Sequence, residues 1–315
     1  MSKERIVFMG TPEFAVSTLK ALLDAKANVV GVITAPDRPA GRGMKLQPSA
    51  VKQFAVENDL TVLQPTNLKS EAFLEDLKSL KATLQIVVAF RMLPEVVWNM
   101  PDHGTFNLHA SLLPQYRGAA PINWAVINGE KESGVSTFFL QHKIDTGDII
   151  FQEKVEIAKN ETAGELHDKL MRVGAKLVVK TLAEIENGDV PSTPQNTIIG
   201  ELNEAPKIFK ETCKIDWNKP ADDVFNLIRG LSPYPTAFTT LISGEDEIGL
   251  KIFSAIKTEK QKDQMPGALT VDGQSLYIAC SVGSIEVLEL QMAGKKRMET
   301  RSFLLGFNLD GYKVR

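Results

Sequence analysis

The sequence is poor in cysteine and contains no long apolar run, and each absence excludes a class of protein. Its 315 residues include only Cys213 and Cys280, which form no metal-binding spacing. Two isolated thiols argue against a disulfide-stabilised secreted protein, and we expect both to be reduced. No apolar run approaches the ~20 residues of a membrane-spanning helix, and the first residues lead into a predicted strand rather than a signal peptide. We therefore expect a cytoplasmic protein with no membrane partner.

The sequence also lacks an excess of charge of either sign. Lys and Arg number 36 and Asp and Glu number 39, which gives a formal net charge of −3 and no global attraction to nucleic acid or anionic membranes. A polyanionic partner would have to meet a local basic patch. Hydrophobic residues make up 43% of the chain and charged residues 24%, as in ordinary globular proteins. The length predicts one large and one smaller domain rather than a single core.

Apolar and amphipathic segments alternate in the first third of the chain. Buried strands are predicted at residues 5–9, 29–35, 61–63 and 84–90, with helices from Thr11, from Ser49 and over 71–80 between them. Repeated strand–helix units predict a Rossmann-like α/β fold, a mostly parallel sheet with helices on both faces. Ligands of such sheets bind beyond the carboxyl ends of the strands. The turn at residues 10–14 lacks the G-x-G-x-x-G dinucleotide fingerprint, which argues against a nicotinamide enzyme.

The second half of the chain changes its pattern twice. A long amphipathic helix is predicted over residues 162–187, followed by a polar segment with several prolines. Short strands separated by glycine-containing turns then predict a small C-terminal β-barrel of the oligonucleotide-binding (OB) type. These strands are expected at residues 237–242, 249–255, 267–271, 275–280 and 284–290. The predicted organisation is an N-terminal catalytic domain (1–189), a linker (190–211) and an OB-like C-terminal domain (212–315).

Three polar residues stand where chemistry is expected. Asn107 and His109 lie two residues apart at the end of a short apolar strand, so they share one face, and Asp145 lies in a later polar loop. Asn can hold an oxyanion, His can exchange a proton near neutrality, and Asp can orient the imidazole. Because no activated nucleophile is adjacent, direct acyl transfer fits better than a covalent intermediate. Each residue also has a purely structural interpretation, as a turn cap, a core histidine or a turn aspartate.

Basic residues gather in two further places. The segment over residues 36–48 is much longer than the ~2–6 residues of most strand-to-helix connections and carries Arg38, Arg42 and Lys45. Such a loop either contacts phosphates or is a solvated insertion. The C-terminal part adds Lys207, Lys210, Lys295, Lys296 and Arg297. A basic run alone is more often a solvated surface.

Five segments together resemble the formyltransferases that use 10-formyltetrahydrofolate. In chain order they are Gly-Thr-Pro-Glu-Phe-Ala, Pro-Asp-Arg-Pro-Ala-Gly-Arg-Gly, Asn-Leu-His-Ala-Ser-Leu-Leu-Pro-Gln-Tyr-Arg-Gly, Asp-Thr-Gly-Asp and Lys-Ile-Asp-Trp. The resemblance spans nearly the whole chain. The third and fourth segments alone would also fit family members that formylate a sugar amine or glycinamide ribonucleotide. The long basic loop and the C-terminal barrel favour members that act on an aminoacyl-tRNA.

The resemblance implies transfer of a formyl group from 10-formyltetrahydrofolate to the α-amino group of methionyl initiator tRNA, by a monomer without a metal. It makes Asn107, His109 and Asp145 the catalytic residues, with protonated His109 and Asn107 stabilising the oxyanion. The implied folate contacts are Phe90, Arg91, Met92, Leu93, Ser111, Leu112, Leu113, Pro114, Gln141, Lys143, Ile144 and Asp148. The implied tRNA contacts are Arg38, Arg42, Lys45, Lys207, Lys210, Lys295, Lys296 and Arg297.

Two other functions stay open on the sequence alone. The first is a formyltransferase whose acceptor is a small amine. The second is a tRNA-binding protein on an enzyme scaffold that no longer catalyses transfer. Turnover of charged initiator tRNA distinguishes both from the function that the resemblance implies.

Overall fold

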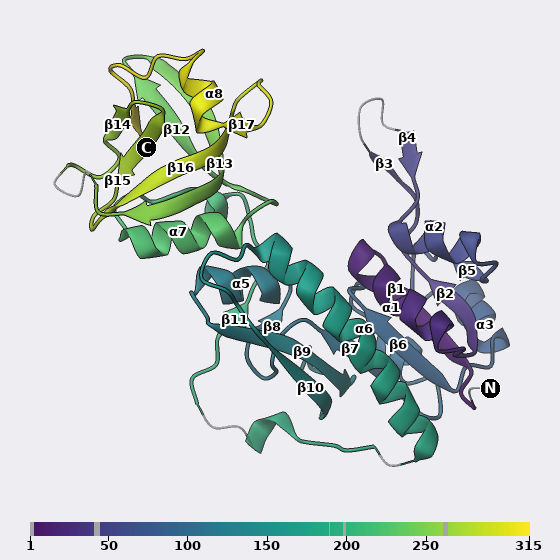
Figure 1. Cartoon of the computed structure of the whole chain (residues 1–315). Coiled ribbons are helices and arrows are strands. Elements are labelled where there is room, and N and C mark those ends of the chain that lie inside the picture. The colour runs from purple at the N-terminus through teal and green to yellow at the C-terminus, as the bar shows by residue number, and fades with distance from the viewer. Residues whose placement is uncertain (1–2, 41–44, 189, 198–199, 261–263) are drawn as a thin grey trace. The chain divides into compact units, whose positions relative to one another are not determined.

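A computed structural model describes residues 3–40, 45–188, 190–197, 200–260 and 264–315 of the chain (Figure 1). The chain divides into two compact units. The N-terminal unit consists of Met1–Gly118, Gly134–Val155 and His167–Glu204, and the C-terminal unit of Ala119–Ser133, Glu156–Leu166 and Ala205–Arg315. Segments that precede residue 190 belong to both units, so the units do not correspond to single cuts along the sequence.

The N-terminal unit contains the expected alternation of strands and helices. The elements that lie wholly or mostly in it are β1 Ile6–Gly10, α1 Glu13–Asp24, β2 Val29–Ile33, β3 Arg38–Ala40, β4 Lys45–Gln47, α2 Ala50–Glu57, β5 Val62–Leu63, α3 Glu71–Ser79, β6 Leu84–Val88, α4 Glu95–Trp98, β7 Thr105–His109, β8 Arg117–Gly118, β9 Glu132–Phe139, β10 Ile149–Glu156, α6 Ala163–Asn187 and the 3-10 helix η1 Gln195–Thr197. The main sheet has the strand order β10-β9-β7-β6-β1-β2-β5. The pairs from β5 to β7 are parallel, and β9 is antiparallel to β7. The predicted Rossmann-like, mostly parallel sheet is confirmed.

The strand order reverses at β1. The chain passes from β1 to β2 and β5 on one side, and then crosses to β6 and β7 on the other side. Loops that leave the carboxyl ends of strands on the two sides of such a point diverge and leave a crevice in which ligands of open α/β sheets bind. The strand order therefore predicts a ligand site among the loops after β1, β6 and β7.

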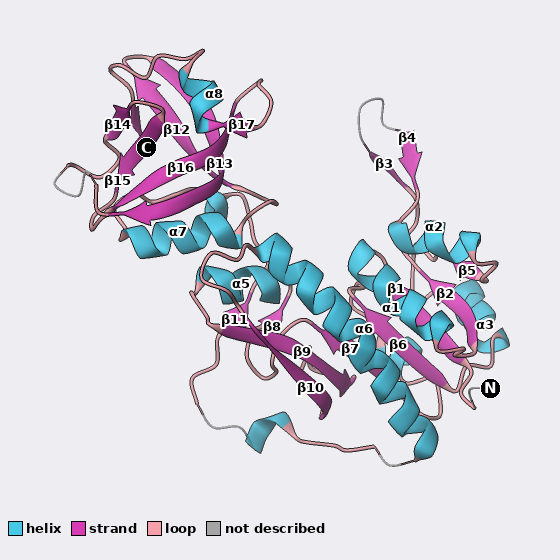
Figure 2. Ribbon diagram, in the orientation of Figure 1, coloured by secondary structure: helices cyan, strands magenta, loops and turns pink. Residues whose placement is uncertain are grey.

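Helices cover both faces of this sheet, as expected because β1 and β6 are buried over their whole length (Figure 2). On one face, Val7 and Met9 of β1 pack in a buried cluster with Leu77 of α3. On the other face, α6 lies so close to β7 that a Cβ added at Gly174 would come within 2.8 Å of Leu108. Because successive strand residues point to opposite faces, the side of β7 that carries Asn107 and His109 faces away from α6.

The long segment after β2 forms a hairpin in its described part. β3 pairs with β4 in the antiparallel register Arg38↔Gln47, and the pair projects from the rest of the unit (Figure 1). Below it, the Asp37 carboxylate accepts hydrogen bonds from Lys52 Nζ at 2.6 Å and Gln64 Nε2 at 2.8 Å. The hydrogen bond from Lys52, followed by that from Gln64, lowers the pKa of Asp37. The sequence predicted a loop here, because three-residue strands are too short to show a pattern.

The C-terminal unit is a curled antiparallel sheet with helices against it, so the OB-like barrel prediction is confirmed. Its elements are α5 Pro121–Ile127, β11 Glu204–Ala205, the 3-10 helix η2 Glu211–Cys213, α7 Ala221–Gly230, β12 Ala237–Ser243, β13 Asp246–Thr258, β14 Leu269–Asp272, β15 Ser275–Ala279, β16 Ser284–Met292, β17 Met298–Glu299, α8 Thr300–Leu304 and β18 Lys313–Val314. The strand order is β14-β15-β16-β13-β12-β18. Val314 N donates to Gly267 O at 3.0 Å, which joins β18 to the segment before β14 and closes the sheet.

Both cysteines are free thiols buried in the core of the C-terminal unit. Burial raises the pKa of Cys280 to about 12, so this thiol stays protonated near neutral pH and is a poor nucleophile. The expectation of two unpaired cysteines is confirmed.

The helices in the described part of the chain are all too short or too polar to span a membrane.

Candidate active site

The end of β7 holds the two central residues of the predicted site. His109 is the last residue of β7 and is only 7% exposed. Asn107 is half-buried and lies between Val87 of β6 and Phe138 of β9. Among the described residues, the Asn107 amide forms no hydrogen bond with another side chain or backbone group. The amide is therefore not used for holding the fold.

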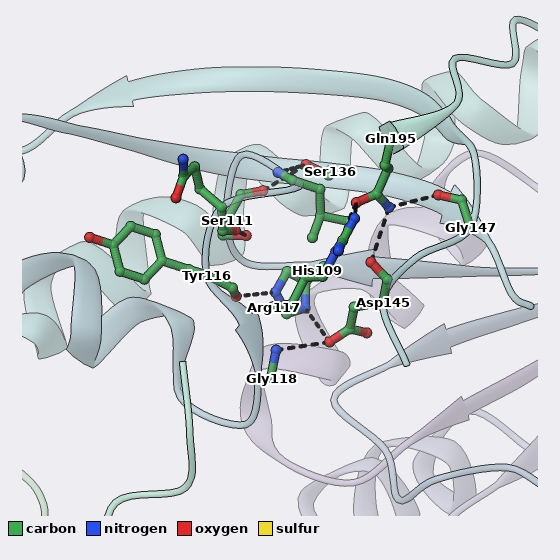
Figure 3. Close-up of polar contacts among 11 residues, drawn as sticks. His109, Ser111, Tyr116, Arg117, Gly118, Ser136, Asp145, Gly147 and Gln195 are labelled. Atoms are coloured by element: carbon green, nitrogen blue, oxygen red, sulfur yellow. Dashed lines mark hydrogen bonds and ion pairs between the residues drawn. The ribbon is translucent and has the colours of Figure 1, made fainter. Parts of the chain in front are cut away.

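Backbone contacts determine how the His109 ring presents its protons (Figure 3). Its Nε2 lies 2.8 Å from the Tyr116 carbonyl oxygen. A carbonyl only accepts hydrogen bonds, so Nε2 carries a proton and donates it. Nδ1 lies 3.9 Å from Asp145 Oδ2, at ion-pair distance but too far for a direct hydrogen bond. The remaining proton site of the imidazole is therefore Nδ1, which faces the carboxylate.

Asp145 is held in place on the loop between β9 and β10. Its Oδ2 accepts a hydrogen bond from Gly118 N at 3.0 Å, and its backbone is left-handed with φ 52°. Asp tolerates this conformation better than most residues, although it still costs energy. The Asp-Thr-Gly segment requires a glycine at position 147, because a Cβ there would overlap the carbonyl oxygen of Phe139. The loop therefore folds back along β9 and brings Asp145 to His109.

The loop after β7 is fastened by two serines. Ser111 Oγ donates to Gln115 O at 2.6 Å, and Ser136 Oγ donates to Ser111 O at 2.6 Å. Ser136 Oγ also accepts from Leu113 N at 3.0 Å. The Ser111 hydroxyl is thus buried and engaged with the backbone, which agrees with the absence of a nucleophile in the sequence pattern.

Sequence reasoning missed Gln195, which contacts the Asp145 loop, and Arg117, which contacts Gln195. Gln195, from the segment predicted to be an extended linker, is only 4% exposed and donates to the carbonyl oxygens of Asp145 and Gly147. Arg117 donates to Gln195 Oε1. The polar, proline-containing composition of residues 190–205 predicted exposure and gave no signal for this burial, because the contacts join residues at least 48 positions apart.

The predicted folate contacts fall into two groups. Phe90, Met92, Leu112, Gln141, Lys143, Ile144 and Asp148 are exposed or partly exposed, whereas Leu93, Ser111, Leu113 and Pro114 are buried. Arg91 is exposed but engaged, since its guanidinium donates to the carbonyls of Pro65 and Thr66 and lies 5.7 Å from the Phe90 ring centroid. Asp148 accepts a hydrogen bond from Ser192 Oγ at 2.7 Å. Several of these residues therefore already have structural partners.

The predicted tRNA contacts also differ in availability. Arg38 is exposed on β3, Lys45 belongs to β4, and Arg42 lies outside the described residues. In the C-terminal unit, Lys207, Lys210, Lys295 and Lys296 are exposed, and Lys207 Nζ lies 5.5 Å from the Phe209 ring centroid.

Arg297 has a carboxylate partner within the chain. It donates two hydrogen bonds to Glu289, one of them at 2.7 Å, and this contact raises its pKa. In addition, its guanidinium carbon lies 4.3 Å from the centroid of the Phe253 ring. A guanidinium with a carboxylate partner contributes less to attraction for a phosphate than a free one.

Among the described residues, no group of three or more His, Cys, Asp and Glu side chains is arranged to hold a metal ion.

The chain belongs to the formyl transferase family. Residues 4–182 match the family model described as formyl transferase, and residues 207–308 match the formyl transferase C-terminal domain. Relatives that match over the whole chain are named methionyl-tRNA formyltransferase. That of Bacteroides fragilis is 55% identical over 100% of this chain and 99% of its own, and that of Flavobacterium johnsoniae is 54% identical over 98% of each.

Solved structures with the same fold include formyltransferases that act on sugars. WlaRD, a sugar 3N-formyl transferase solved in the presence of dTDP and 5-N-formyl-THF, has a TM-score of 0.66 and 21% identity over 93% of this chain and 99% of its own. The N-formyltransferase of Helicobacter canadensis, solved with folinic acid and dTDP-3-aminofucose, has a TM-score of 0.66 and 21% identity over 94% of this chain and 100% of its own. At this identity the likeness establishes the fold alone.

Proposed function

We propose that this chain transfers the formyl group of 10-formyltetrahydrofolate to the α-amino group of methionyl initiator tRNA, as a cytoplasmic monomer. The observation that carries the proposal is the grouping of Asn107, His109 and Asp145 at the end of β7, in a chain 55% identical over its full length to a methionyl-tRNA formyltransferase. Folate compounds in the two sugar enzymes of the same fold support a folate donor. Residues 1–189 are proposed as the catalytic domain, 190–211 as the connecting segment and 212–315 as the tRNA-binding domain.

The residues present fit a reaction at a carbonyl carbon. When bound, 10-formyltetrahydrofolate supplies the formyl carbon and the nitrogen that leaves it. The Asn107 amide, which has no partner among the described residues, donates a hydrogen bond to the carbonyl oxygen as negative charge develops there when the methionyl amine attacks. A donor aimed at developing charge lowers the barrier because the fold has already oriented it.

His109 acts through Nδ1 in this proposal. Since Nε2 donates to Tyr116 O at 2.8 Å, only Nδ1 can donate to the developing oxyanion or exchange a proton with the reacting groups. Asp145 Oδ2, 3.9 Å away, stabilises the charged ring. A water molecule is proposed to carry the proton from the attacking amine to the departing nitrogen.

The exposed members of the two loops near the site are proposed to contact the folate. Phe90 and Met92 follow β6, and Gln141, Lys143 and Ile144 precede Asp145. The buried Leu93, Ser111, Leu113 and Pro114 and the engaged Arg91 are proposed to shape the pocket by holding these loops, with Leu112 and Asp148 at its margin. Arg38, Arg42 and Lys45 are proposed to meet the acceptor end of the tRNA, and Lys207, Lys210, Lys295, Lys296 and Arg297 its body.

Formyl-transfer assays with the purified chain test the proposal. We expect transfer from 10-formyltetrahydrofolate to methionyl initiator tRNA, and no comparable kcat/KM with glycinamide ribonucleotide or a nucleotide-linked amino sugar. Faster transfer to either small amine would assign the chain to another branch of the family. Binding of the charged tRNA without any turnover would instead support a non-catalytic binding protein.

Lys207 and Lys210 provide a test of the tRNA surface. Replacing both with alanine should weaken binding of tRNA and reduce the slope of log Kd against log salt by about two, because each lysine that neutralises a phosphate releases about one counterion. The measurement is a set of tRNA titrations at several salt concentrations.

The matched control for this charge change is Lys20→Ala, since Lys20 is exposed on α1 and paired with Asp24 at 2.8 Å. Its salt slope should equal that of the unmodified chain. An unchanged slope for the double variant would show that the two lysines belong to a solvated surface.

A further inference from the structure

The side chain of Gln195 is saturated with hydrogen bonds although its neighbours in sequence are exposed. Its Oε1 accepts from Arg117 Nε at 3.1 Å and from Arg117 Nη2 at 2.6 Å. Its Nε2 donates to Asp145 O at 3.0 Å and to Gly147 O at 2.7 Å. Guanidinium groups only donate and carbonyls only accept, so the chemistry of the partners sets which end of the amide is oxygen and which is nitrogen.

These contacts form a closed ring around the acid of the site (Figure 3). Gly118 N holds the Asp145 carboxylate at 3.0 Å, and the adjacent Arg117 holds Gln195. Gln195 returns to the backbone carbonyl of Asp145 at 3.0 Å. Asp145 is therefore fixed both at its side chain and at its backbone, where its φ of 52° would otherwise relax toward a more favourable region.

The chain that follows α6 is held where Gln195 can reach this loop. Thr193 and Ile149 exchange two backbone hydrogen bonds, each of 2.9 Å. These bonds pair the segment with the first residue of β10. Ser192 Oγ also donates to the Asp148 carboxylate at 2.7 Å. Gln195 lies between residues 182 and 207, outside both stretches that match the family models.

We propose that Gln195 is a positioning residue for formyl transfer, which orients the Asp145 carboxylate toward His109 Nδ1 by holding the Asp145–Gly147 backbone. This inference rests on the proposed function. Arg117 orients the Gln195 amide and so acts one step further from the reacting atoms. A displacement of about 1 Å at a catalytic group costs up to about 10²-fold in rate, and the site has no other donor on these two carbonyls among the contacts of the described residues.

Gln195→Glu tests the donor role at nearly constant size. A carboxylate keeps the contact with Arg117 but places an acceptor against two carbonyl oxygens, so it removes both donated hydrogen bonds. We expect kcat with methionyl-tRNA to fall about 10- to 100-fold, KM for both substrates to change less than about 2-fold, and the thermal unfolding midpoint to show a folded protein. Asn196→Ala, at the exposed neighbour in η1, is the matched control and should leave kcat unchanged.

A double-mutant cycle with Asp145→Asn separates positioning from a general loss of structure. If Gln195 acts through Asp145, adding Gln195→Glu to Asp145→Asn should lower kcat by less than about 3-fold, because the two effects overlap. Full multiplication of the two losses, or wild-type kcat in the single variant, would overturn the inference.

If the glutamate variant does not fold, Gln195→Met, which keeps the volume without polar atoms, is measured by the same criteria. Absence of transfer by the unmodified chain would contradict the proposed function itself, whereas activity of that chain with an unaffected Gln195→Glu would contradict only the role of Gln195.

Discussion

Replacing His109 with alanine is expected to lower kcat for formyl transfer by about 10²- to 10⁴-fold, the range of a positioned acid–base group. The ring is 7% exposed, its Nε2 is committed to Tyr116 O, and its Nδ1 faces Asp145. Alanine removes the Nδ1 proton from the site, and the Asp145 carboxylate then has no cation to stabilise. Steady-state kinetics with saturating methionyl-tRNA and 10-formyltetrahydrofolate measures the loss.

Binding of methionyl-tRNA separates this catalytic loss from misfolding. The Kd of His109→Ala for the charged tRNA should stay within about 2-fold of the unmodified chain, since the basic contacts that position the phosphates are elsewhere. His103→Ala is the matched control, because His103 lies before the amino end of β7 and its Nδ1 is 2.8 Å from Glu4 Oε1; its kcat should not change. A wild-type kcat for His109→Ala would remove His109 from the mechanism.

The second large effect is expected at Asn107. Asn107→Ala should lower kcat by about 10²- to 10³-fold, the typical cost of removing one oxyanion donor, with little change in KM. Asn107→Asp should be at least as damaging although it is nearly isosteric, because a carboxylate repels the negative charge that develops on the carbonyl oxygen. The measurement is kcat and KM for both variants under the same conditions.

The comparison between the two Asn107 variants distinguishes a donor from a packing residue. If the side chain only filled space, Asn107→Asp would keep most of the activity and Asn107→Ala would lose it. The matched control is Asn58→Ala, at the exposed end of α2, where the amide donates to Phe54 O at 2.8 Å. Its kcat should equal that of the unmodified chain.

Much of the N-terminal architecture could be predicted because the signals are local. The apolar segments that became β1, β2 and β6 are buried over most of their length, and burial on both faces is what a central parallel strand requires. The long helix was predicted over 162–187 and observed as Ala163–Asn187. The hairpin β3–β4 was not predicted, because pairs of three residues carry too little periodicity to distinguish them from a loop.

The sequence by itself determined that Asn107 and His109 share one face at the end of a strand, because the alternation of side chains in a strand is local. The tertiary structure decided which proton of His109 is available, since that depends on the Tyr116 carbonyl. It also decided that Arg297 already has a carboxylate partner and that Gln195 is part of the site. These last properties arise from hydrogen bonds with directional geometry, made where the folded chain brings donors and acceptors together, and such contacts leave no repeat in the amino-acid sequence.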